Sequence, residues 1–242
     1  MWSNKEICTF VDLTSLNAFD SKKSIDEFLH DALNYQQQGF SVAAVCLFPN
    51  FSAQAVEKLK HSSIKTAVVA GNFPNSQGFL ATRLKECEYV LENGVDEVDI
   101  VLNLGAFEDQ DYQLVVSEIK AFKGLMPNKT LKVILETGYL KSKKRIQKAS
   151  ELAIEGGADF IKTSTGKGFE GATLEAVDAM AETIASHKST REVGLKISGG
   201  VRSSSDAVRF FEVIEKHLGQ SYITPDRIRI GASSLVSNLI NE

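Results

Sequence analysis

Short runs of β-branched and other apolar residues alternate along the chain with longer stretches in which apolar residues recur every three or four positions. The short runs predict strands, and the longer stretches predict amphipathic helices. Eight strands are expected, at residues 10–14, 42–48, 64–70, 97–102, 131–136, 159–163, 193–197 and 227–231. The helical pattern is clearest at residues 81–94. Gly39, Gly94 and Gly156 stand where helices of this kind would end.

Eight strands that alternate with helices over 242 residues favour a (β/α)8 TIM barrel over a doubly wound sheet. No low-complexity segment or linker rich in Pro, Gly and Ser divides the chain, so residues 1–242 are expected to form one domain. Hydrophobic residues make up 43% of the chain and charged residues 24%, which is typical of a globular protein. A chain of this length can bury a large core without disulfides or structural metal.

The net charge of −4 and the lack of a basic block argue against nucleic acid or an anionic membrane surface as a partner. Three cysteines occur far apart, with no C-x-x-C pair, which indicates a reducing compartment and no zinc site. Four histidines occur singly, so no metal is assigned to them. No apolar run reaches the length of a signal peptide core or a membrane span, and we expect a cytoplasmic protein.

Polar and small residues stand at the ends of the predicted strands, where the chemistry of a TIM barrel gathers. In chain order these are Asp12, Thr14, Cys46, Gly71, Asp99, Asn103, Glu136, Lys162, Lys196 and Gly231. Any single lysine among them is more often solvated than catalytic. Asp99 lies within the apolar run V-D-I-V-L, and a buried carboxylate needs charged partners. Lys162 and Lys196, on adjacent strands, would supply them.

Two lysines and an acid are suited to imine formation. A lysine amine must be neutral to attack a carbonyl, and its ordinary pKa is about 10.4. Burial and a neighbouring cation both favour the neutral amine. Lys162 and Lys196 each follow apolar residues and could face each other across the barrel. One would then be the nucleophile, while the other would hold it neutral and pass protons with Asp99.

Small residues also stand at the ends of the seventh and eighth strands, in S-G-G-V-R (198–202) and G-A-S-S (231–234). Backbone N–H groups in such loops, just before a helix, can approach an anion. These loops hold the usual phosphate position of the fold. Glycines that only make turns would explain either loop alone, but they explain the adjacent pair less well. A phosphate site is therefore predicted here.

The stretch G-K-G-F-E-G (166–171) fits the glycine spacing of a dinucleotide-binding turn. In a true fingerprint the first glycine directly follows the strand, and an acid ends the next strand. Here Lys162 to Thr165 separate the apolar run from Gly166, and the next strand ends in K-I-S. We therefore interpret these glycines as part of a flexible loop.

Eight motifs in order resemble those of the deoxyribose-phosphate aldolase family, over nearly the whole chain. They are D-L-T-S-L (12–16), V-C-L-F-P (45–49), G-N-F-P (71–74), V-D-E-V-D-I-V-L-N (95–103), K-V-I-L-E-T (132–137), G-A-D-F-I-K-T-S-T-G (157–166), V-G-L-K-I-S-G-G-V-R (193–202) and R-I-G-A-S-S (229–234). The resemblance implies a class I aldolase that needs no cofactor. Its reaction would be the reversible cleavage of 2-deoxy-D-ribose 5-phosphate to D-glyceraldehyde 3-phosphate and acetaldehyde.

The resemblance also implies roles for individual residues. Lys162 matches the Schiff-base lysine, Lys196 the second lysine and Asp99 the acid of the proton relay. Positions that line the sugar or the relay fall on Asp12, Thr14, Thr165 and Lys167, and a pocket cysteine falls on Cys46. The phosphate positions fall on Gly199, Gly200, Gly231, Ser233 and Ser234, and Arg202 of the same loops is assigned to substrate binding. The family suggests a homodimer. Two alternatives stay open: a Schiff-base aldolase for another phosphosugar, and a barrel that binds a phosphosugar without turnover.

Overall fold

The eight predicted strands close into one parallel barrel in a computed structural model of the chain, which describes residues 2–187 and 192–242. Each strand pairs with the next one in the sequence, and β8 pairs with β1. The strands are β1 (Val11–Thr14), β2 (Ala44–Leu47), β3 (Lys65–Val69), β4 (Glu97–Val101), β5 (Thr130–Ile134), β6 (Phe160–Lys162), β7 (Gly194–Ser198) and β8 (Ile228–Ala232). The TIM barrel prediction is confirmed.

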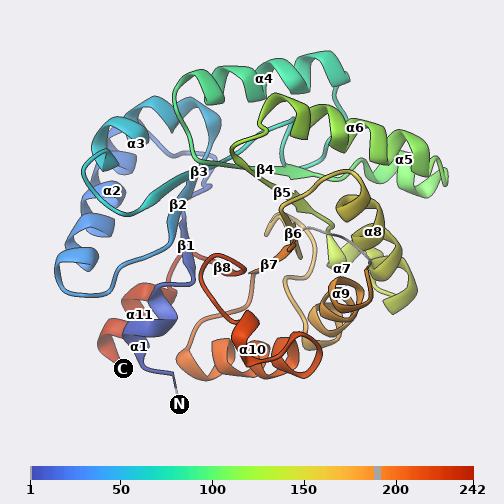
Figure 1. The fold of residues 1–242 in the computed structure, drawn as a ribbon. Coiled ribbons are helices and arrows are strands. Elements are labelled where there is room, and N and C mark those ends of the chain that lie inside the picture. The colour runs from blue at the N-terminus through green and yellow to red at the C-terminus, as the bar shows by residue number, and fades with distance from the viewer. Residues whose placement is uncertain (1, 188–191) are drawn as a thin grey trace.

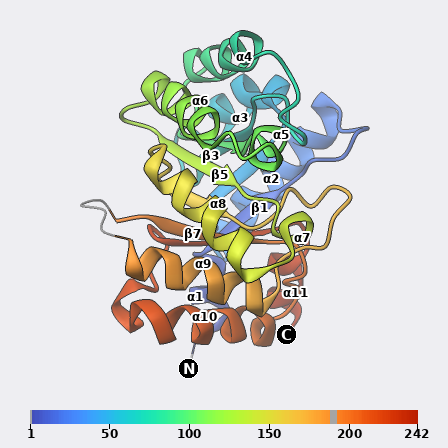
Figure 2. The same cartoon turned by 90° about the vertical axis from the view of Figure 1, so that its right-hand side faces the viewer.

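Helices surround the barrel as an outer ring (Figure 1). They are α1 (Asn4–Cys8), α2 (Lys22–Gln37), α3 (Ser52–Leu59), α4 (Leu80–Glu92), α5 (Leu104–Glu108), α6 (Tyr112–Leu125), α7 (Thr137–Leu140), α8 (Lys143–Glu155), α9 (Leu174–Ser186), α10 (Ser204–Leu218) and α11 (Leu235–Asn241), with 3-10 turns at Pro49–Phe51 and Gln220–Tyr222. The side view shows the loop after β6 and α7 together at one end of the barrel (Figure 2). Within the described ranges, no helix combines the length and apolarity that crossing a membrane requires.

The helix ends follow local chemistry. The side chains of Ser142 and Ser203 accept hydrogen bonds from the N–H groups of the first turns of α8 and α10. Gly94 takes a φ of 90° just after α4, as its position predicted. α8 also ends where predicted, with Gly156 as its C-cap; Gly156 stays right-handed with a φ of −69°, and the next residue, Gly157, turns the chain with a φ of 101°.

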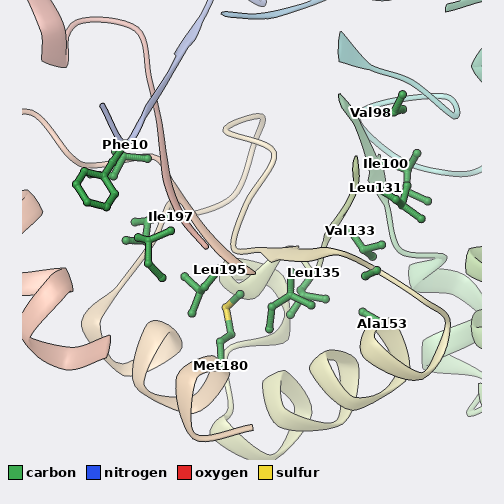
Figure 3. Packing of buried hydrophobic residues seen from close by; sticks show 14 of the residues in the cluster. Phe10, Val98, Ile100, Leu131, Val133, Leu135, Ala153, Met180, Leu195 and Ile197 are labelled. Carbon is green, nitrogen blue, oxygen red and sulfur yellow. The ribbon is translucent and has the colours of Figure 1, made fainter. Parts of the chain in front are cut away.

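The outer faces of the strands pack against the helices in one large core. In Figure 3, Val133, Leu135 and Leu195 on the strand side lie near Ala153 of α8 and Met180 of α9, and all five are buried. This burial on both faces explains why the strands read as nearly continuous apolar runs. Burial of this kind contributes roughly 25 cal/mol per Å² of apolar surface.

The barrel interior is lined by apolar side chains on two strands and by charged side chains on the other six. On β2 and β3, the small residues Ala44, Cys46, Ala67 and Val69 form a separate buried apolar cluster with Leu16. The other strands send buried charged side chains into the same space. An apolar wall beside charged groups removes water from them and strengthens their mutual interactions.

An aromatic ring at the start of β6 packs against the first residue of β7. The Phe160 ring on β6 lies so close to Gly194 on β7 that a Cβ at residue 194 would be 2.3 Å from the ring. The Arg229 guanidinium, on β8, lies over the same ring, with Cζ 5.6 Å from the ring centroid. Gly194 is therefore required for this packing, which sets the position of Arg229.

Candidate active site

Seven buried charged side chains meet inside the barrel and form what we call the ion network. Its members come from β1, β4, β5, β6, β7 and β8, and none has more than 3% of its surface exposed. They are Asp12, Glu97, Asp99, Lys132, Lys162, Lys196 and Arg229. Burial on this scale is tolerated only where charges are paired, as these are.

Asp99 is the centre of the ion network. Its Oδ2 accepts hydrogen bonds from the Nζ atoms of Lys162 at 2.8 Å and Lys196 at 2.9 Å, and its Oδ1 accepts one from Lys132 Nζ at 2.9 Å. Burial alone would raise the pKa of Asp99, but the three lysines outweigh it and hold the pKa well below its ordinary value. Asp99 is therefore an ionised acceptor that faces both predicted lysines, and its predicted pairing with them is confirmed.

Lys162 and Lys196 are direct neighbours on β6 and β7, in register with each other. The expectation that they face each other across the barrel is therefore wrong, because the two strands pair. Burial lowers the pKa of Lys162, and although Asp99 opposes this, the nearby charge of Lys196 adds to it, so that the pKa lies below its ordinary value. This direction is the one that nucleophilic attack requires.

Lys196 has the opposite tendency. Its Nζ lies 2.6 Å from Asp12 Oδ2 and 2.9 Å from Asp99 Oδ2. Burial alone would lower the pKa of Lys196, but the two carboxylates raise it well above its ordinary value. The surroundings thus shift the pKa values of two lysines on adjacent strands in opposite directions, toward the neutral amine at Lys162 and toward the ammonium at Lys196.

Glu97, Lys132 and Arg229 belong to the ion network, but strand-end reasoning missed them. Lys132 Nζ lies 2.5 Å from Glu97 Oε2, and Arg229 donates to Glu97 Oε1 at 2.9 Å and to Asp12 Oδ1 at 2.7 Å. All three precede the last residue of their strands by two or more positions, but so do Asp99 and Lys196, so position along the strand does not distinguish them. The available signal was the one that identified Asp99, a charged residue between apolar neighbours, as in L-K-V and I-R-I.

A cavity of about 290 Å³ opens at the carboxyl ends of the strands, next to the ion network. Among the predicted substrate residues, those that line it are Thr14, Thr165, Lys167, Gly199, Gly200, Arg202, Gly231, Ser233 and Ser234. Residues that line it without having been predicted are Leu16, Asn17, Gly166, Ser198, Val201 and Ala232. Of the ion network, Lys162 alone belongs to the lining. The amine that is poised to be neutral is thus the one that a ligand can reach.

Four predicted site residues, Asp12, Cys46, Asp99 and Lys196, are wholly buried and do not line the cavity. Cys46 is part of the apolar wall, and burial raises the pKa of its thiol, so that it remains protonated. Asp12 contacts Lys196 and Arg229 and lies outside the cavity lining. Asn103, another strand-end candidate, caps α5 through the Ala106 N–H and donates to Glu118.

The loop after β6 is held in place by Glu136, at the end of β5. Glu136 adopts a left-handed φ of 58°, which is rare for a residue with a side chain. Its carboxylate accepts hydrogen bonds from the hydroxyl of Thr165 at 2.5 Å and the N–H of Thr165 at 3.2 Å. Farther along the loop, Lys167 Nζ donates to the Leu16 carbonyl at 2.5 Å. These contacts tie three loops together around the cavity.

The neighbouring rim, formed by the loops after β7 and β8, is built from small residues. Gly199 and Gly200 have φ values of 85° and 91°, which side chains rarely adopt. A Cβ at Gly231 would lie 2.4 Å from Ser198 Oγ, so that Ser198 occupies the space which the glycine leaves. The Ser198 hydroxyl is buried without a protein partner and lines the cavity. It adds a polar group to this rim that the motif S-G-G-V-R contained but that the prediction did not use.

The chain is similar to known aldolases in sequence and in fold. Residues 8–234 match a family model described as DeoC/LacD family aldolase. The chain is 35% identical to the deoxyribose-phosphate aldolase of Homo sapiens, over 98% of this chain and 79% of the relative. It resembles the solved structure of QR15, an aldolase, with a TM-score of 0.81 and 33% identity over 98% of this chain and 95% of the other. A putative deoxyribose-phosphate aldolase from Coccidioides immitis has a TM-score of 0.85 and 28% identity, over 99% and 86%. The chain belongs to the DeoC/LacD family of aldolases.

Proposed function

We propose that this chain catalyses the reversible aldol cleavage of 2-deoxy-D-ribose 5-phosphate to D-glyceraldehyde 3-phosphate and acetaldehyde, through an imine on Lys162. The proposal is based on the fact that Lys162 contacts both the ion network and the cavity. Its Nζ contacts the buried Asp99 at 2.8 Å, and its side chain also lines the cavity. Asp99 and Lys196 are assigned the proton transfers.

The first step joins Lys162 to the aldehyde of the open-chain sugar. The neutral Nζ attacks C1 and gives up one proton, and the carbonyl oxygen takes up a proton from solvent to give a carbinolamine. Loss of the former carbonyl oxygen as water then forms the iminium ion. Asp99 accepts the proton that Nζ loses and returns it to the leaving hydroxyl, because its carboxylate lies within hydrogen-bond distance of Nζ. Lys196, bonded to the same Oδ2, takes part in this exchange.

The second step breaks the C2–C3 bond. Removal of the proton from the C3 hydroxyl turns C3 into the aldehyde of glyceraldehyde 3-phosphate, and the electron pair of the broken bond moves to the iminium nitrogen as an enamine forms. Protonation of the enamine at C2 and hydrolysis of the resulting iminium ion release acetaldehyde and restore Lys162. The apolar wall of β2 and β3 favours this chemistry, because an iminium next to excess water would hydrolyse early.

The phosphate is assigned to the rim formed by the loops after β7 and β8. Gly199, Gly200, Ser233 and Ser234 offer backbone N–H and hydroxyl donors there, and Arg202 supplies positive charge, while Lys167 is assigned to the sugar or the relay. Gly231 allows close approach. Thr14 and Thr165 are assigned to the sugar hydroxyls. Asp12, which lies outside the cavity lining, is assigned to the proton relay through Lys196.

The proposal is tested by borohydride reduction in the presence of acetaldehyde, followed by peptide mass mapping. We expect a two-carbon adduct on Lys162, because its amine is the reactive one that a ligand in the cavity can reach. An adduct found mainly on Lys196 or Lys167 would show that the roles are wrongly assigned.

Two further measurements separate this function from its alternatives. Cleavage rates on a panel of phosphosugars distinguish the aldolase for deoxyribose phosphate from a Schiff-base aldolase for another sugar. Phosphosugar binding without any adduct would indicate a barrel that does not turn over. A control with EDTA should leave activity unchanged, and loss that zinc restores would point to a metal-dependent mechanism.

We further propose that the chain forms a single catalytic domain, acts in the cytoplasm and assembles as a homodimer. All three cysteines are free and buried, which fits a reducing compartment. Phe79, at the start of α4, is 88% exposed and is a candidate for contact between copies. Light scattering on the purified protein tests the assembly, and a monomeric mass at micromolar concentration would contradict it.

A further inference from the structure

Three members of the ion network, Glu97, Lys132 and Arg229, neither line the cavity nor contact Lys162 Nζ within ion-pair distance. We infer that they are positioning residues which balance the charge around Asp99 and Asp12, so that the Lys162 amine is neutral in the resting enzyme. This inference rests on the proposed imine chemistry of Lys162. It adds a function to the deeper half of the ion network, which the reaction steps leave unused.

Successive ion pairs connect Arg229 and Glu97, the members farthest from the cavity along these contacts, to Lys162. Arg229 bridges Glu97 and Asp12, with distances of 2.9 Å to Glu97 Oε1 and 2.7 Å to Asp12 Oδ1. Lys132 bridges Glu97 and Asp99, at 2.5 Å and 2.9 Å. Asp99 then reaches Lys162. A change of charge at Lys132 is thus two contacts from the reactive amine, and a change at Glu97 is three contacts from it, in a region without exposed side chains.

The count of charges selects Lys162 as the neutral member. Asp12, Glu97 and Asp99 carry three negative charges, and Lys132, Lys196 and Arg229 carry three positive charges. A protonated Lys162 would be a seventh, unbalanced charge in a buried site, which is costly. Lys132, Lys196 and Arg229 each contact at least two carboxylates, whereas Lys162 contacts Asp99 alone among the described residues.

Lys132 also fixes the orientation of Asp99. It holds Oδ1, which leaves Oδ2 directed to Lys162 and Lys196. When Lys162 Nζ becomes part of an imine, Asp99 keeps two ammonium partners and its position. Without Lys132, both oxygens of Asp99 would depend on the two lysines of the reacting side.

The remaining titratable groups near Lys162 are the same in every variant considered below. Cys46 faces it from β2, Glu136 from the end of β5, and Lys196 from β7. Glu136 is bonded to Thr165 and to none of the cations of the ion network. The apolar residues of β3 complete the surroundings.

The test uses three variants: Glu97→Gln, Lys132→Met and the double variant. Each protein is incubated briefly with acetaldehyde at a series of pH values and then reduced with excess borohydride at one fixed pH. The rate of adduct formation on Lys162, plotted against pH, gives a midpoint for each protein. The wild-type adduct on Lys162 tests the proposed function, and the midpoints test this inference, so that the two can fail separately.

We expect the two single variants to move the midpoint in opposite directions. Lys132→Met removes a positive charge and favours protonated Lys162, so the midpoint rises by about one pH unit and the adduct rate at a given acidic pH falls about tenfold. Glu97→Gln removes a negative charge and lowers the midpoint. The double variant restores the balance, and its midpoint lies between those of the single variants.

A matched control is the buried ion pair of Arg83 and Glu118, which lies between α4 and α6 at 2.6 Å, outside the barrel interior. Arg83→Met removes a buried cation without changing the charge of the ion network, and its midpoint should equal that of the wild type. Folding is monitored by circular dichroism, and if Lys132→Met does not fold, Glu97→Gln and the double variant still decide the matter. Midpoints that stay at the wild-type value while rates fall would overturn the inference and leave a structural role only.

Discussion

Lys162 and Lys196 show how far identical residues can differ in chemistry. They are paired in register on adjacent strands, and both are buried. The difference is in their partners, because Lys196 contacts two carboxylates and Lys162 contacts one. One additional carboxylate contact reverses the direction in which the pKa moves. A reactive lysine is thus defined by its neighbours more than by its own position.

At this scale we expect Lys196→Arg to lose turnover. A guanidinium stays charged and cannot pass a proton near neutral pH, so kcat should fall at least about a hundredfold, the size typical of a missing acid–base group. The loss should be the same for 2-deoxyribose and its 5-phosphate, because Lys196 does not line the cavity. Steady-state kinetics on both substrates measure it.

Arg202→Leu is the matched control for Lys196→Arg. Arg202 lines the cavity at the proposed phosphate rim, so this variant should raise KM for the phosphorylated sugar and leave the unphosphorylated sugar unaffected. If Lys196→Arg behaves in the same way, with a near-normal kcat, then Lys196 is a phosphate ligand and the proton relay is wrongly assigned.

The sequence was sufficient for some members of the ion network and insufficient for others. Asp99, Lys162 and Lys196 were predicted because a buried acid needs cations and the strand order places two lysines nearby. Lys132, in register with Asp99 on β5, and Arg229 on β8 were missed, because the sequence does not specify whether a side chain within a strand points into the barrel or toward the helices. That direction depends on the tilt and stagger of the strands, which are properties of the closed barrel.

At the scale of elements, the contact between β6 and β7 positions the Phe160 ring, which packs against Arg229. Eight strands followed from the periodicity of the sequence, but the requirement for a glycine at residue 194 did not, because it depends on the Phe160 ring of the neighbouring strand. The same contact places Phe160 beneath Arg229. The packing of Gly194 against Phe160 is therefore in contact with the ion network through Arg229.

We expect Gly194→Ala to destabilise the fold by about 1–3 kcal/mol, the usual cost of overpacking a core. The new Cβ would lie 2.3 Å from the Phe160 ring, so that the ring or the strand must move. Urea unfolding measures the change. Phe160→Leu combined with Gly194→Ala should recover part of the loss, since the smaller side chain relieves the overlap.

The matched control for Gly194→Ala is Gly124→Ala. Gly124 lies in α6, and no atom would come within 4 Å of a new Cβ there. This variant should be neutral or more stable by up to about 1 kcal/mol, the propensity difference between the two residues in a helix. Equal effects of the two substitutions would contradict the account of β6 and β7.

At the scale of the whole molecule, the barrel combines a stable shell with an interior that is partly unfavourable. The apolar core between strands and helices drives folding, while the ion network gains little over apolar side chains of similar volume. Lys162 has a direct cost to stability. Its pKa is lowered in the folded protein, so the folded chain binds this proton less tightly than the unfolded chain does. The free energy of unfolding is therefore reduced at pH values below the unfolded pKa of about 10.4, including pH 7.

Replacing each of the two neighbouring lysines with methionine should therefore change stability in opposite directions. Lys162→Met removes a disfavoured amine while Asp99 keeps Lys132 and Lys196, so the melting temperature at pH 7 should rise although activity is lost. This gain should shrink as the pH approaches 10, where the unfolded chain also loses the proton. Lys196→Met leaves Asp12 and Asp99 short of a partner and should cost about 3 kcal/mol or more. Calorimetry at pH 7 and pH 10 measures both variants. A melting temperature that falls in both would mean that Lys162 stabilises the fold, and that its amine is charged in the resting enzyme.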